Sequence, residues 1–416
     1  MLEREVKLGA GPAFHLPDLG GVLEGAVAEP AEVLRLETVY HDTPDLRLAR
    51  WGVSLRHRAG EGWTLKLAPA STGEVLERDE LTYAGGPKKP PEAALAVVRA
   101  FVRRSSVVPV ARLSTVRRRV RLTDPAGRRL AEVVDDEVSV RDGRRVATRF
   151  REIEVEVPDG APIEVLVNRL RTAGAGAPDP TPKHVRALGP RALEPPEVAP
   201  VKVLSDSPGR DVIKNALAEC VASLLRHDPL VRTSGDPEAV HQARVATRKL
   251  RSHLRTFGPL LEPEWLDPLR TELGWLGLAL GAVRDREVLL ERLRARAQEL
   301  PEDDRRAAVG LLKILEQEIA GLRKKLMTDL DSERYVDLLE RLVAAALDPS
   351  TMPDAQLAAV GSLPVIASGP WRRLRSAVRQ LPGRPTDPEL HRIRILAKRA
   401  RYAAEAVAPV TGPGAM

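Results

Sequence analysis

The chain begins with charged residues at alternate positions. In the segment EREVK, Glu3, Glu5 and Lys7 are spaced two residues apart, so a β-strand would place all three side chains on one face. A single strand of this kind is typical of a solvated sheet edge. Two carboxylates beside an amine are also groups that hold a metal ion together with an anion. The other strands of the chain must decide between these two interpretations.

Further segments repeat the pattern of charge on one face of a strand. The aligned polar side chains are Arg56 with Arg58, Thr64 with Lys66, Arg78 with Glu80, Arg117 with Arg119 and Arg121, Glu132 with Asp136, and Glu152 with Glu154 and Glu156. The opposite faces of GWTLKL and REIEVEV are apolar. If outer helices cover the apolar faces, the charged faces line the interior of a closed barrel, which must be wet, internally paired or filled by ions.

Cations beside clustered carboxylates indicate an anion bound together with a metal ion. Carboxylates are hard oxygen ligands suited to Mg²⁺ or Mn²⁺, whereas Arg and Lys suit phosphoryl oxygens. A polyphosphate with a divalent metal would satisfy both sets. The chain contains no GxxxxGK[ST] loop, so side-chain cations would have to hold the phosphates.

A basic motif occurs twice in the second half of the chain. HQARVATRKLR, from His241, and HRIRILAKRAR, from His391, share the pattern H-x-x-R-[VI]-x-x-[RK]-[RK]-x-R, which indicates an internal duplication. On a helix the first copy gathers its cations within an arc of roughly 80°. The two predicted stripes are His241, Arg244, Arg248, Arg251 and Arg255, and His391, Arg394, Lys398 and Arg401.

The composition of these stripes favours a phosphate ligand that carries no bases. A solvated helix face normally mixes acids with its bases, and residues 241–255 contain no acid. Proteins that bind single-stranded nucleic acid usually have aromatic residues between their cations, on which the bases stack. The only aromatic residue near the stripes is Tyr402. We therefore expect an anion-binding surface, and nucleic acid is not the expected partner.

Two kinds of periodicity position these residues. Up to about residue 157 the chain alternates in short segments, which predicts many antiparallel strands with a helix at 91–104. Residues 173–210 are rich in Pro and Gly and are predicted to be a linker. From residue 211 a period of 3.6 predicts a helical bundle, with a Pro-rich break around 349–370.

Composition bounds the class of protein. The chain has 416 residues and a net charge of +7, with an isoelectric point near 9.7, which favours two or three domains and anionic partners. Its single cysteine, Cys220, has no partner for a disulfide or a cysteine-based zinc site. No run of 18 apolar residues and no signal-peptide pattern occurs, so we expect a cytoplasmic protein with no membrane partner.

The N-terminal pattern resembles a known family. EREVK resembles the ExExK signature of the CYTH family, the triphosphate tunnel metalloenzymes, and LRHR, TLK, RDE, RRR, EVVDD and EIEVE follow in that family's order over about residues 1–190. The resemblance implies an α+β multidomain chain. Its first domain, residues 1–200, would be an eight-stranded antiparallel tunnel with outer helices, which holds a triphosphate and one or two metal ions.

The resemblance also implies roles for individual residues. Glu3, Glu5 and Lys7 are implied to be catalytic. The implied phosphate ligands are Lys7, Arg56, Arg58, Lys66, Arg78, Arg117, Arg119 and Lys183, and the implied metal shell is Glu3, Glu5, Asp136, Glu154 and Glu156. Second choices are Glu80, Glu132 and Glu152. The family often has a Ser-Lys pair near the end of this domain, whereas here a proline precedes Lys183.

Residues 205–416 resemble a CHAD domain, on the duplicated motif and on LGAVRD at 280–285. The resemblance implies two pseudo-symmetric all-α bundles that bind inorganic polyphosphate. The residues implied to bind it are His241, Arg244, Arg248, Lys249, Arg251, Arg255, His391, Arg394, Lys398, Arg399 and Arg401. The second copy of the motif has no LGxxRD counterpart after it, so we expect a shortened chain whose second bundle is incomplete, with a last helix that is mobile or covered by a neighbouring chain.

Three functions follow from these expectations. The first is metal-dependent hydrolysis of inorganic triphosphate or short polyphosphate, with Mg²⁺ or Mn²⁺ as cofactor and the helical domain recruiting the polymer. The second is a non-catalytic polyphosphate-binding protein, which could be targeted to polyphosphate granules. The third is an adenylate cyclase or thiamine triphosphatase, which the lack of an aromatic-rich base pocket disfavours.

Overall fold

The computed structural model describes residues 3–68, 80–158, 161–357 and 359–411, without the side chains of Glu3, Val360 and Ser362. The described chain divides into two compact units, residues 1–196 and 197–416. None of the helices in the described ranges is both long and apolar enough to cross a membrane.

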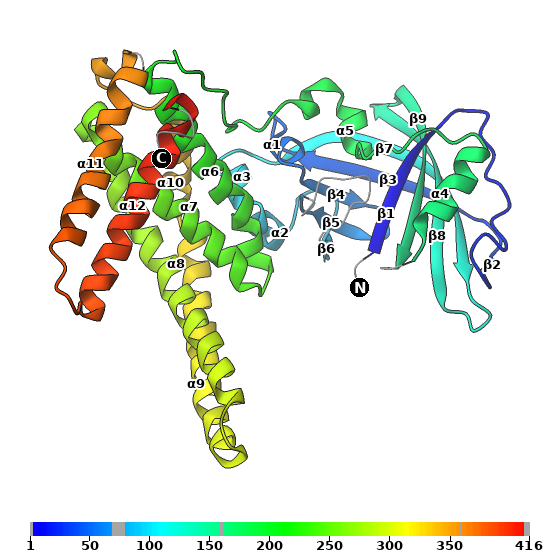
Figure 1. The fold of residues 1–416 in the computed structure, drawn as a ribbon. Helices are drawn as coiled ribbons and strands as arrows, with labels where there is room; N and C mark the ends of the chain where they lie inside the picture. The colour runs from blue at the N-terminus through cyan, green and yellow to red at the C-terminus, as the bar shows by residue number, and fades with distance from the viewer. Residues whose placement is uncertain (1–2, 69–79, 159–160, 358, 412–416) are drawn as a thin grey trace. The chain divides into compact units, whose positions relative to one another are not determined.

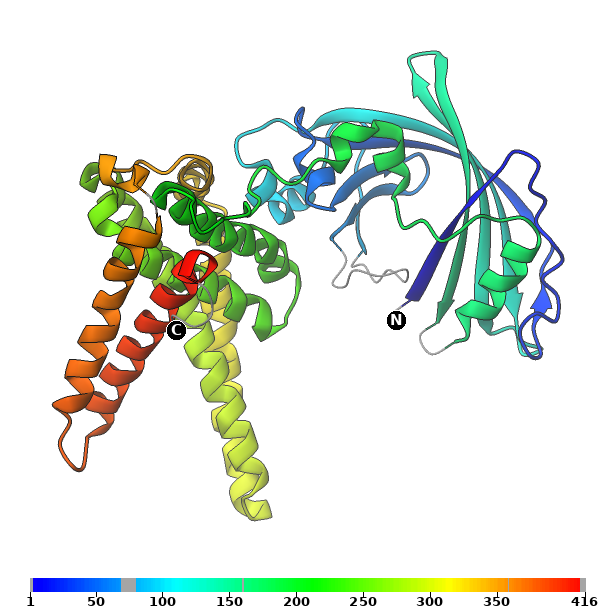
Figure 2. The ribbon, with the colours of Figure 1, turned by 45° about the horizontal axis from the view of Figure 1, so that its top comes forward.

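The first unit is built on one antiparallel sheet that curls into a half-barrel (Figure 1, Figure 2). Its main path runs β1-β9-β8-β7-β3-β4-β5-β6, and β2 pairs with β7. The strands are β1 Glu3–Ala10, β2 Val27–Ala28, β3 Glu32–Asp42, β4 Ser54–Arg58, β5 Gly62–Lys66, β6 Glu80–Tyr83, β7 Val108–Thr123, β8 Arg129–Asp142 and β9 Arg145–Pro158. The eight-stranded antiparallel architecture is confirmed. Within the described residues the sheet is open, because β1 and β6 form its two ends.

Short helices complete this unit. They are α1 Arg47–Arg50, α2 Glu92–Val97, α3 Arg99–Val102, α4 Ile163–Thr172 and α5 Lys183–Leu188, with a 3-10 turn at Pro190–Leu193. Helices α2 and α3 confirm the helix predicted at 91–104. Helix α5 lies inside the predicted linker, so the first part of that Pro/Gly-rich stretch is an integral part of the β unit.

Alternation along the strands decides which side chains face outward. Ile153 and Val155 of β9 are fully buried against Leu166 of α4 on the outer, convex side of the sheet (Figure 2). Trp63 and Leu65 of β5 are likewise fully buried. The apolar faces are therefore covered as predicted, and the charged faces turn toward the concave interior.

The second unit is entirely helical. Its elements are α6 Gly209–Thr233, α7 Pro237–Thr256, α8 Pro263–Gln298, α9 Glu302–Leu330, α10 Glu333–Leu347, α11 Ala359–Arg379 and α12 Asp387–Thr411, with 3-10 turns at Gly258–Leu260 and Pro353–Gln356. Helices α8 and α9 form a long antiparallel hairpin (Figure 1). The predicted break at 349–370 is too long, because α11 continues through Pro364 and Pro370.

Local sequence explains where α7 begins. Pro237 occupies its first turn, where the missing N–H costs nothing, and the Asp236 carboxylate accepts a hydrogen bond from the Glu238 N–H at 2.8 Å. The apolar side chains Val240, Leu250 and Leu254 are fully buried on one side of the helix. This arrangement leaves the basic stripe of the duplicated motif on the other side.

Candidate active site and cationic face

Strand register brings the predicted charges together inside the half-barrel. Lys7 of β1 pairs across the ladder with Glu154 of β9, and Glu5 pairs with Glu156. Asp136 of β8 pairs with both Arg117 of β7 and Glu152 of β9. Residues far apart in the chain thus face one another on four adjacent strands.

Lys7 is a buried cation held by two carboxylates. Its Nζ lies 2.9 Å from Glu5 Oε1 and also bonds Glu154 Oε1. Burial on its own would lower the pKa of Lys7, but the charges of Glu154 and Glu5 outweigh it and raise that pKa. Lys7 is therefore charged at neutral pH.

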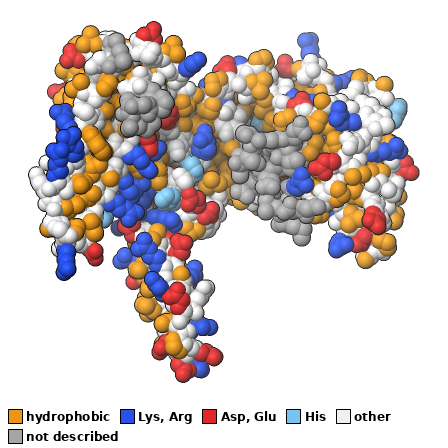
Figure 3. All heavy atoms as spheres, viewed as in Figure 1, with side chains coloured by type: hydrophobic (Ala, Val, Ile, Leu, Met, Phe, Trp, Pro, Cys, Tyr) orange, Lys and Arg blue, Asp and Glu red, His pale blue; other side chains and the backbone are white. Residues whose placement is uncertain are grey.

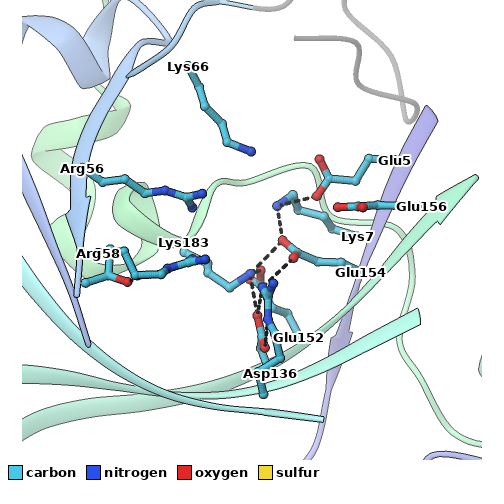
Figure 4. Close-up of polar contacts among 12 residues, drawn as sticks. Glu5, Lys7, Arg56, Arg58, Lys66, Asp136, Glu152, Glu154, Glu156 and Lys183 are labelled. Carbon is cyan, nitrogen blue, oxygen red and sulfur yellow. Dashed lines mark hydrogen bonds and ion pairs between the residues drawn. The ribbon is translucent and has the colours of Figure 1, made fainter. Parts of the chain in front are cut away.

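Lys183 reaches the same carboxylates from α5 (Figure 4). Its Nζ lies 2.7 Å from Glu154 Oε1, 2.7 Å from Glu152 Oε1 and 2.9 Å from Asp136 Oδ2. Burial opposes the charge on this amine, yet Glu154, Glu152 and Asp136 together raise its pKa well above the ordinary value. The helix in the expected linker thus places a cation among three acids.

The pKa values of the two central glutamates, Glu152 and Glu154, are shifted in opposite directions. Burial raises the pKa of Glu152, and Lys183 offsets this only in part. Burial also opposes ionisation of Glu154, but Lys183, Lys7 and Arg117 hold the pKa of that carboxyl well below its ordinary value. Arg117 lies 3.2 Å from Glu154 and forms a two-pronged pair with Asp136 at 2.9 and 2.7 Å.

One acidic group has the geometry to hold a metal ion. Oxygens of Glu5, Glu154 and Glu156 lie within 4.8 Å of one another. Three carboxylates are hard ligands that fit Mg²⁺ or Mn²⁺, and Glu5 and Glu156 remain partly exposed to the interior. Asp136, also predicted as a metal ligand, lies apart from this group and is paired with Arg117 and Lys183.

A cationic wall faces the acids across the interior. Figure 4 shows Arg56, Arg58 and Lys66 pointing from β4 and β5 toward Glu5, Lys7 and Glu154. Glycines with positive φ at 60 and 62 make the tight turn between these two strands, and Arg58 lies 2.9 Å from Glu61 in that turn. The pKa of Arg58 is lowered first by burial and then by the charge of Arg56, so an anion placed between them would stabilise both.

Other predicted residues form ion pairs away from the acidic group of Glu5, Glu154 and Glu156. Arg119 bonds Glu32 at 2.5 Å, and Glu132 lies 3.4 Å from Arg121. Glu80 lies 2.6 Å from Lys66 and 3.7 Å from Arg56, so it partly neutralises the cationic wall. The side chain of Glu3 and the whole of Arg78 lie outside the described residues.

Strand β3 contributes interior residues that the sequence analysis did not identify. Thr38 accepts a hydrogen bond from Arg58 Nε at 3.3 Å, and the ring of Tyr40 stacks on His184 of α5, with centroids 5.1 Å apart. The alternation of residues 32–40 places Thr38 and Tyr40 on the same face as Leu34 and Leu36. Because two leucines share this face, the sequence pattern makes the face look apolar.

The basic stripes of the two motif copies meet in the helical unit. Arg248 of α7 donates a hydrogen bond to the Tyr402 hydroxyl of α12 at 3.1 Å, and Lys249 lies 3.1 Å from Glu405. Lys and Arg side chains gather on this part of the surface (Figure 3). We call the surface formed by Arg244, Arg248, Arg251, Arg255, Arg394, Lys398 and Arg399 the cationic face.

The cations of this face repel one another. The pKa of Lys398 is lowered by burial and then by Arg248, Arg394 and Arg244. The pKa of Arg255 is lowered by burial and then by Arg399, with smaller effects from other arginines. The cations are therefore close enough to repel one another, and a polyanion would relieve that repulsion.

Two glycines of α8 lie beside arginines of the cationic face. A Cβ at Gly281 would lie 3.6 Å from the Arg244 guanidinium, and one at Gly277 would lie 3.5 Å from that of Arg251. Arg244 is also paired with Asp285 at 2.6 Å. The LGAVRD segment therefore supports the stripe of α7 directly.

The structure adds cations to the predicted stripes and gives two of the predicted cations an acidic partner. Arg373 of α11 and Arg270 of α8 act on the same cations, and the sequence analysis did not include them. Lys249 and Arg401 both turn toward Glu405, at 3.1 and 3.2 Å. His241 and His391 lie on the two motif helices, and burial lowers the pKa of His241.

Comparison with known proteins agrees with this two-unit arrangement. The CYTH domain matches residues 1–175 and the CHAD domain matches residues 215–416. The uncharacterized proteins MT2285 and Rv2226, from two strains of Mycobacterium tuberculosis, are each 33% identical to this chain over 444 residues, covering 97% of this chain and 82% of theirs.

Two solved structures are similar over about half of the chain. PptA from Streptomyces chartreusis is 26% identical, with a TM-score of 0.43, and the match covers 50% of this chain and 77% of that one. The CHAD domain from the plant Ricinus communis is 26% identical, with a TM-score of 0.43, covering 51% of this chain and 70% of that one. The chain belongs to the family in which a CYTH domain, the metal-dependent fold of the triphosphate tunnel enzymes, is joined to a CHAD domain.

Proposed function

We propose that the β unit hydrolyses inorganic triphosphate or short polyphosphate with a divalent metal ion, and that the helical unit binds inorganic polyphosphate. The observation that supports the catalytic part is the opposition of two walls in one interior. Arg56, Arg58 and Lys66 face the acidic group across it (Figure 4). An interior with only one of these walls would suit a metal or an anion, but not their complex.

Each wall has a distinct role in this proposal. Glu5, Glu154 and Glu156 would hold Mg²⁺ or Mn²⁺, which neutralises charge on phosphoryl oxygens and lowers the pKa of bound water. Arg56, Arg58 and Lys66 would bind and align the phosphates for in-line attack by water. No covalent nucleophile on the protein is needed.

Lys7 would act at the boundary between metal and phosphate. Its ammonium group is charged and fixed between Glu5 and Glu154, so it orients these carboxylates before the ligand arrives. When an anion enters, an N–H of this group that is not used by the two carboxylates would donate to a phosphoryl oxygen. Lys183 and Arg117 would keep Glu154 ionised, so that its carboxylate is ready to bind a metal ion.

The cationic face supports the polyphosphate part of the proposal. Its residues repel one another, no aromatic ladder accompanies them among the described residues, and Tyr402 is buried beneath the arginines. Such a face binds a flexible chain of charges better than it binds stacked bases. The proposed partners are inorganic polyphosphate for this face and triphosphate for the sheet interior.

A phosphate-release panel tests the proposal. The full chain is incubated with inorganic triphosphate, long-chain polyphosphate, ATP or thiamine triphosphate, each with Mg²⁺, Mn²⁺ or a chelator. We expect metal-dependent release that is fastest from inorganic triphosphate. Release from none of these substrates would favour the non-catalytic polyphosphate-binding protein, and a preference for ATP or thiamine triphosphate would favour the nucleotide or thiamine enzyme.

A further inference from the structure

A small cavity lies between α6, α7 and α12, next to the cationic face. Its volume is about 180 Å³, several times the roughly 30 Å³ that one water molecule occupies in the liquid. Small apolar side chains line part of it, from Ala216, Val245, Ala246, Ala406 and Pro409. The rest of the lining is Cys220 and polar side chains, none of which belongs to the cationic face as defined above.

Two buried polar atoms in this lining lack partners. Asn215 Oδ1 and His253 Nδ1 have no hydrogen bond within the described chain, although their residues are only 7% and 5% exposed. The Asn215 amide nitrogen donates to Glu219 Oε1 at 2.9 Å, which fixes the amide orientation and leaves Oδ1 as an acceptor. Because buried polar atoms nearly always have partners, this pair indicates a polar occupant.

The remaining polar groups define which kind of occupant fits. Glu219 and Glu405 add two carboxylates, and the one cation of the lining, Lys249, is already paired with Glu405 at 3.1 Å. Burial lowers the pKa of His253 to about 4, so its imidazole is neutral at pH 7 and can accept a hydrogen bond. Glu405 also pairs with Arg401 at 3.2 Å, which leaves Asn215 Oδ1, His253 Nδ1 and the Glu219 carboxylate as the acceptors available to an occupant.

We propose that this cavity binds a small primary ammonium ion, with N–H groups donated to Asn215, His253 and Glu219 and a short alkyl chain packed against the alanines. An anion would face the Glu219 carboxylate and the acceptor Oδ1 of Asn215. A coordinated metal fits less well, because within the described residues the acidic, histidine and cysteine side chains converge closely only at Glu5, Glu154 and Glu156. The proposal does not depend on polyphosphate binding or on catalysis.

The test is a titration of the full chain, labelled at histidine, with n-butylammonium, followed by nuclear magnetic resonance of the His253 ring at pH 7.5. n-Butanol is the neutral control, with the same alkyl chain. We expect a saturable shift of the His253 signal with the ammonium ion and at least tenfold weaker binding of the alcohol. Equal effects of the two compounds, or a shift with neither because the cavity holds water alone, would overturn the proposal.

Two variants test whether n-butylammonium binds in this cavity. Asn215→Leu fills the cavity and removes an acceptor, and Glu219→Gln removes a charge from a more exposed side chain in case the first variant fails to fold. Each is expected to weaken n-butylammonium binding at least tenfold. Gln317→Leu, on the exposed surface of α9, is the matched control and should leave binding unchanged. Undiminished binding by Glu219→Gln would contradict the proposal.

Discussion

The interior of the β unit and the cationic face of the helical unit are both rich in Lys and Arg, but their cations have opposite environments. In the interior, the carboxylates around Lys7 and Lys183 raise the pKa of both amines. On the helical face, burial and neighbouring cations lower the pKa of Lys398 and Arg255.

This difference indicates two ways of binding a phosphate polymer. Lys7 and Lys183 are compensated before a ligand arrives, so an anion that binds them must enter with metal ions or displace existing pairs. On the helical face Lys398 and Arg255 lie among other cations, and a polyanion gains directly by relieving the repulsion between them. We therefore expect binding at the interior to depend on metal and precise geometry, whereas binding at the face depends on salt.

Glu5→Gln should have the largest effect. The substitution removes one charge from the acidic group and one partner of Lys7, while the shape of the side chain is kept. We expect metal-dependent release of phosphate from triphosphate to fall about 100-fold or more, with an unchanged circular dichroism spectrum. Glu137→Gln is the control, because Glu137 is exposed and pairs with Arg118 on the outer side of the same sheet. An equal loss in both variants would show that the effect is not specific to the interior.

Arg58→Ala should weaken substrate binding more than turnover. Charge-assisted hydrogen bonds contribute about 1.5–3 kcal/mol, so KM for triphosphate should rise on the order of tenfold or more. Arg149→Ala, at an exposed position of β9, should leave KM unchanged. Steady-state kinetics separates the two quantities, and a fall in kcat with constant KM would remove Arg58 from the phosphate wall.

Charge reversal on the helical face should reduce polyphosphate affinity on the order of tenfold, because repulsion of the polyanion replaces attraction at two positions. The test uses two double variants. One carries Arg248→Glu and Lys398→Glu, and the control carries Lys313→Glu and Lys325→Glu on the exposed surface of α9. Wild-type affinity should fall steeply with salt. Tighter binding of base-rich single-stranded DNA at matched salt would favour a nucleic-acid partner.

His253 gives a smaller, pH-dependent effect on stability. Burial lowers its pKa from 6.5 to about 4 in the folded chain, so between these values the unfolded chain binds the extra proton. Stability is therefore lost as pH falls from 6.5 toward 4. Between pH 7.5 and 5.5 this linkage amounts to about 1 kcal/mol.

His253→Leu should remove this contribution, so its free energy of unfolding should decline less than that of the wild type over the same interval. Urea unfolding of the helical unit within the full chain, followed at both pH values, measures the difference. Parallel declines in the two proteins would show that folding does not lower the pKa of the His253 imidazole.

Alternation predicted which side chains line the interior, but not which of them pair with one another. The faces of β5 and β9 follow from a period of two residues, a local property. The contacts of Arg119 with Glu32 and of Arg117 with Asp136 depend on the register between distant strands, which a local pattern does not encode.

Helix α5 shows the same limit more sharply. It is six residues long and follows a proline, so it is too short to show helical periodicity within a Pro/Gly-rich stretch. The resemblance identified Lys183, but its contacts with three carboxylates emerge only when α5 folds against the interior. In the helical unit, the motif predicted the stripes, whereas Arg373 of α11 joins them through tertiary packing alone.

The claim that one interior binds metal and triphosphate together is tested most directly by the binding of Mn²⁺, measured by electron paramagnetic resonance with and without a non-hydrolysable imido analogue of triphosphate. The account predicts that Mn²⁺ and the analogue each strengthen the binding of the other in the wild type, and that Glu5→Gln abolishes this coupling. Binding of the analogue with equal affinity in Mn²⁺ and in chelator would contradict it.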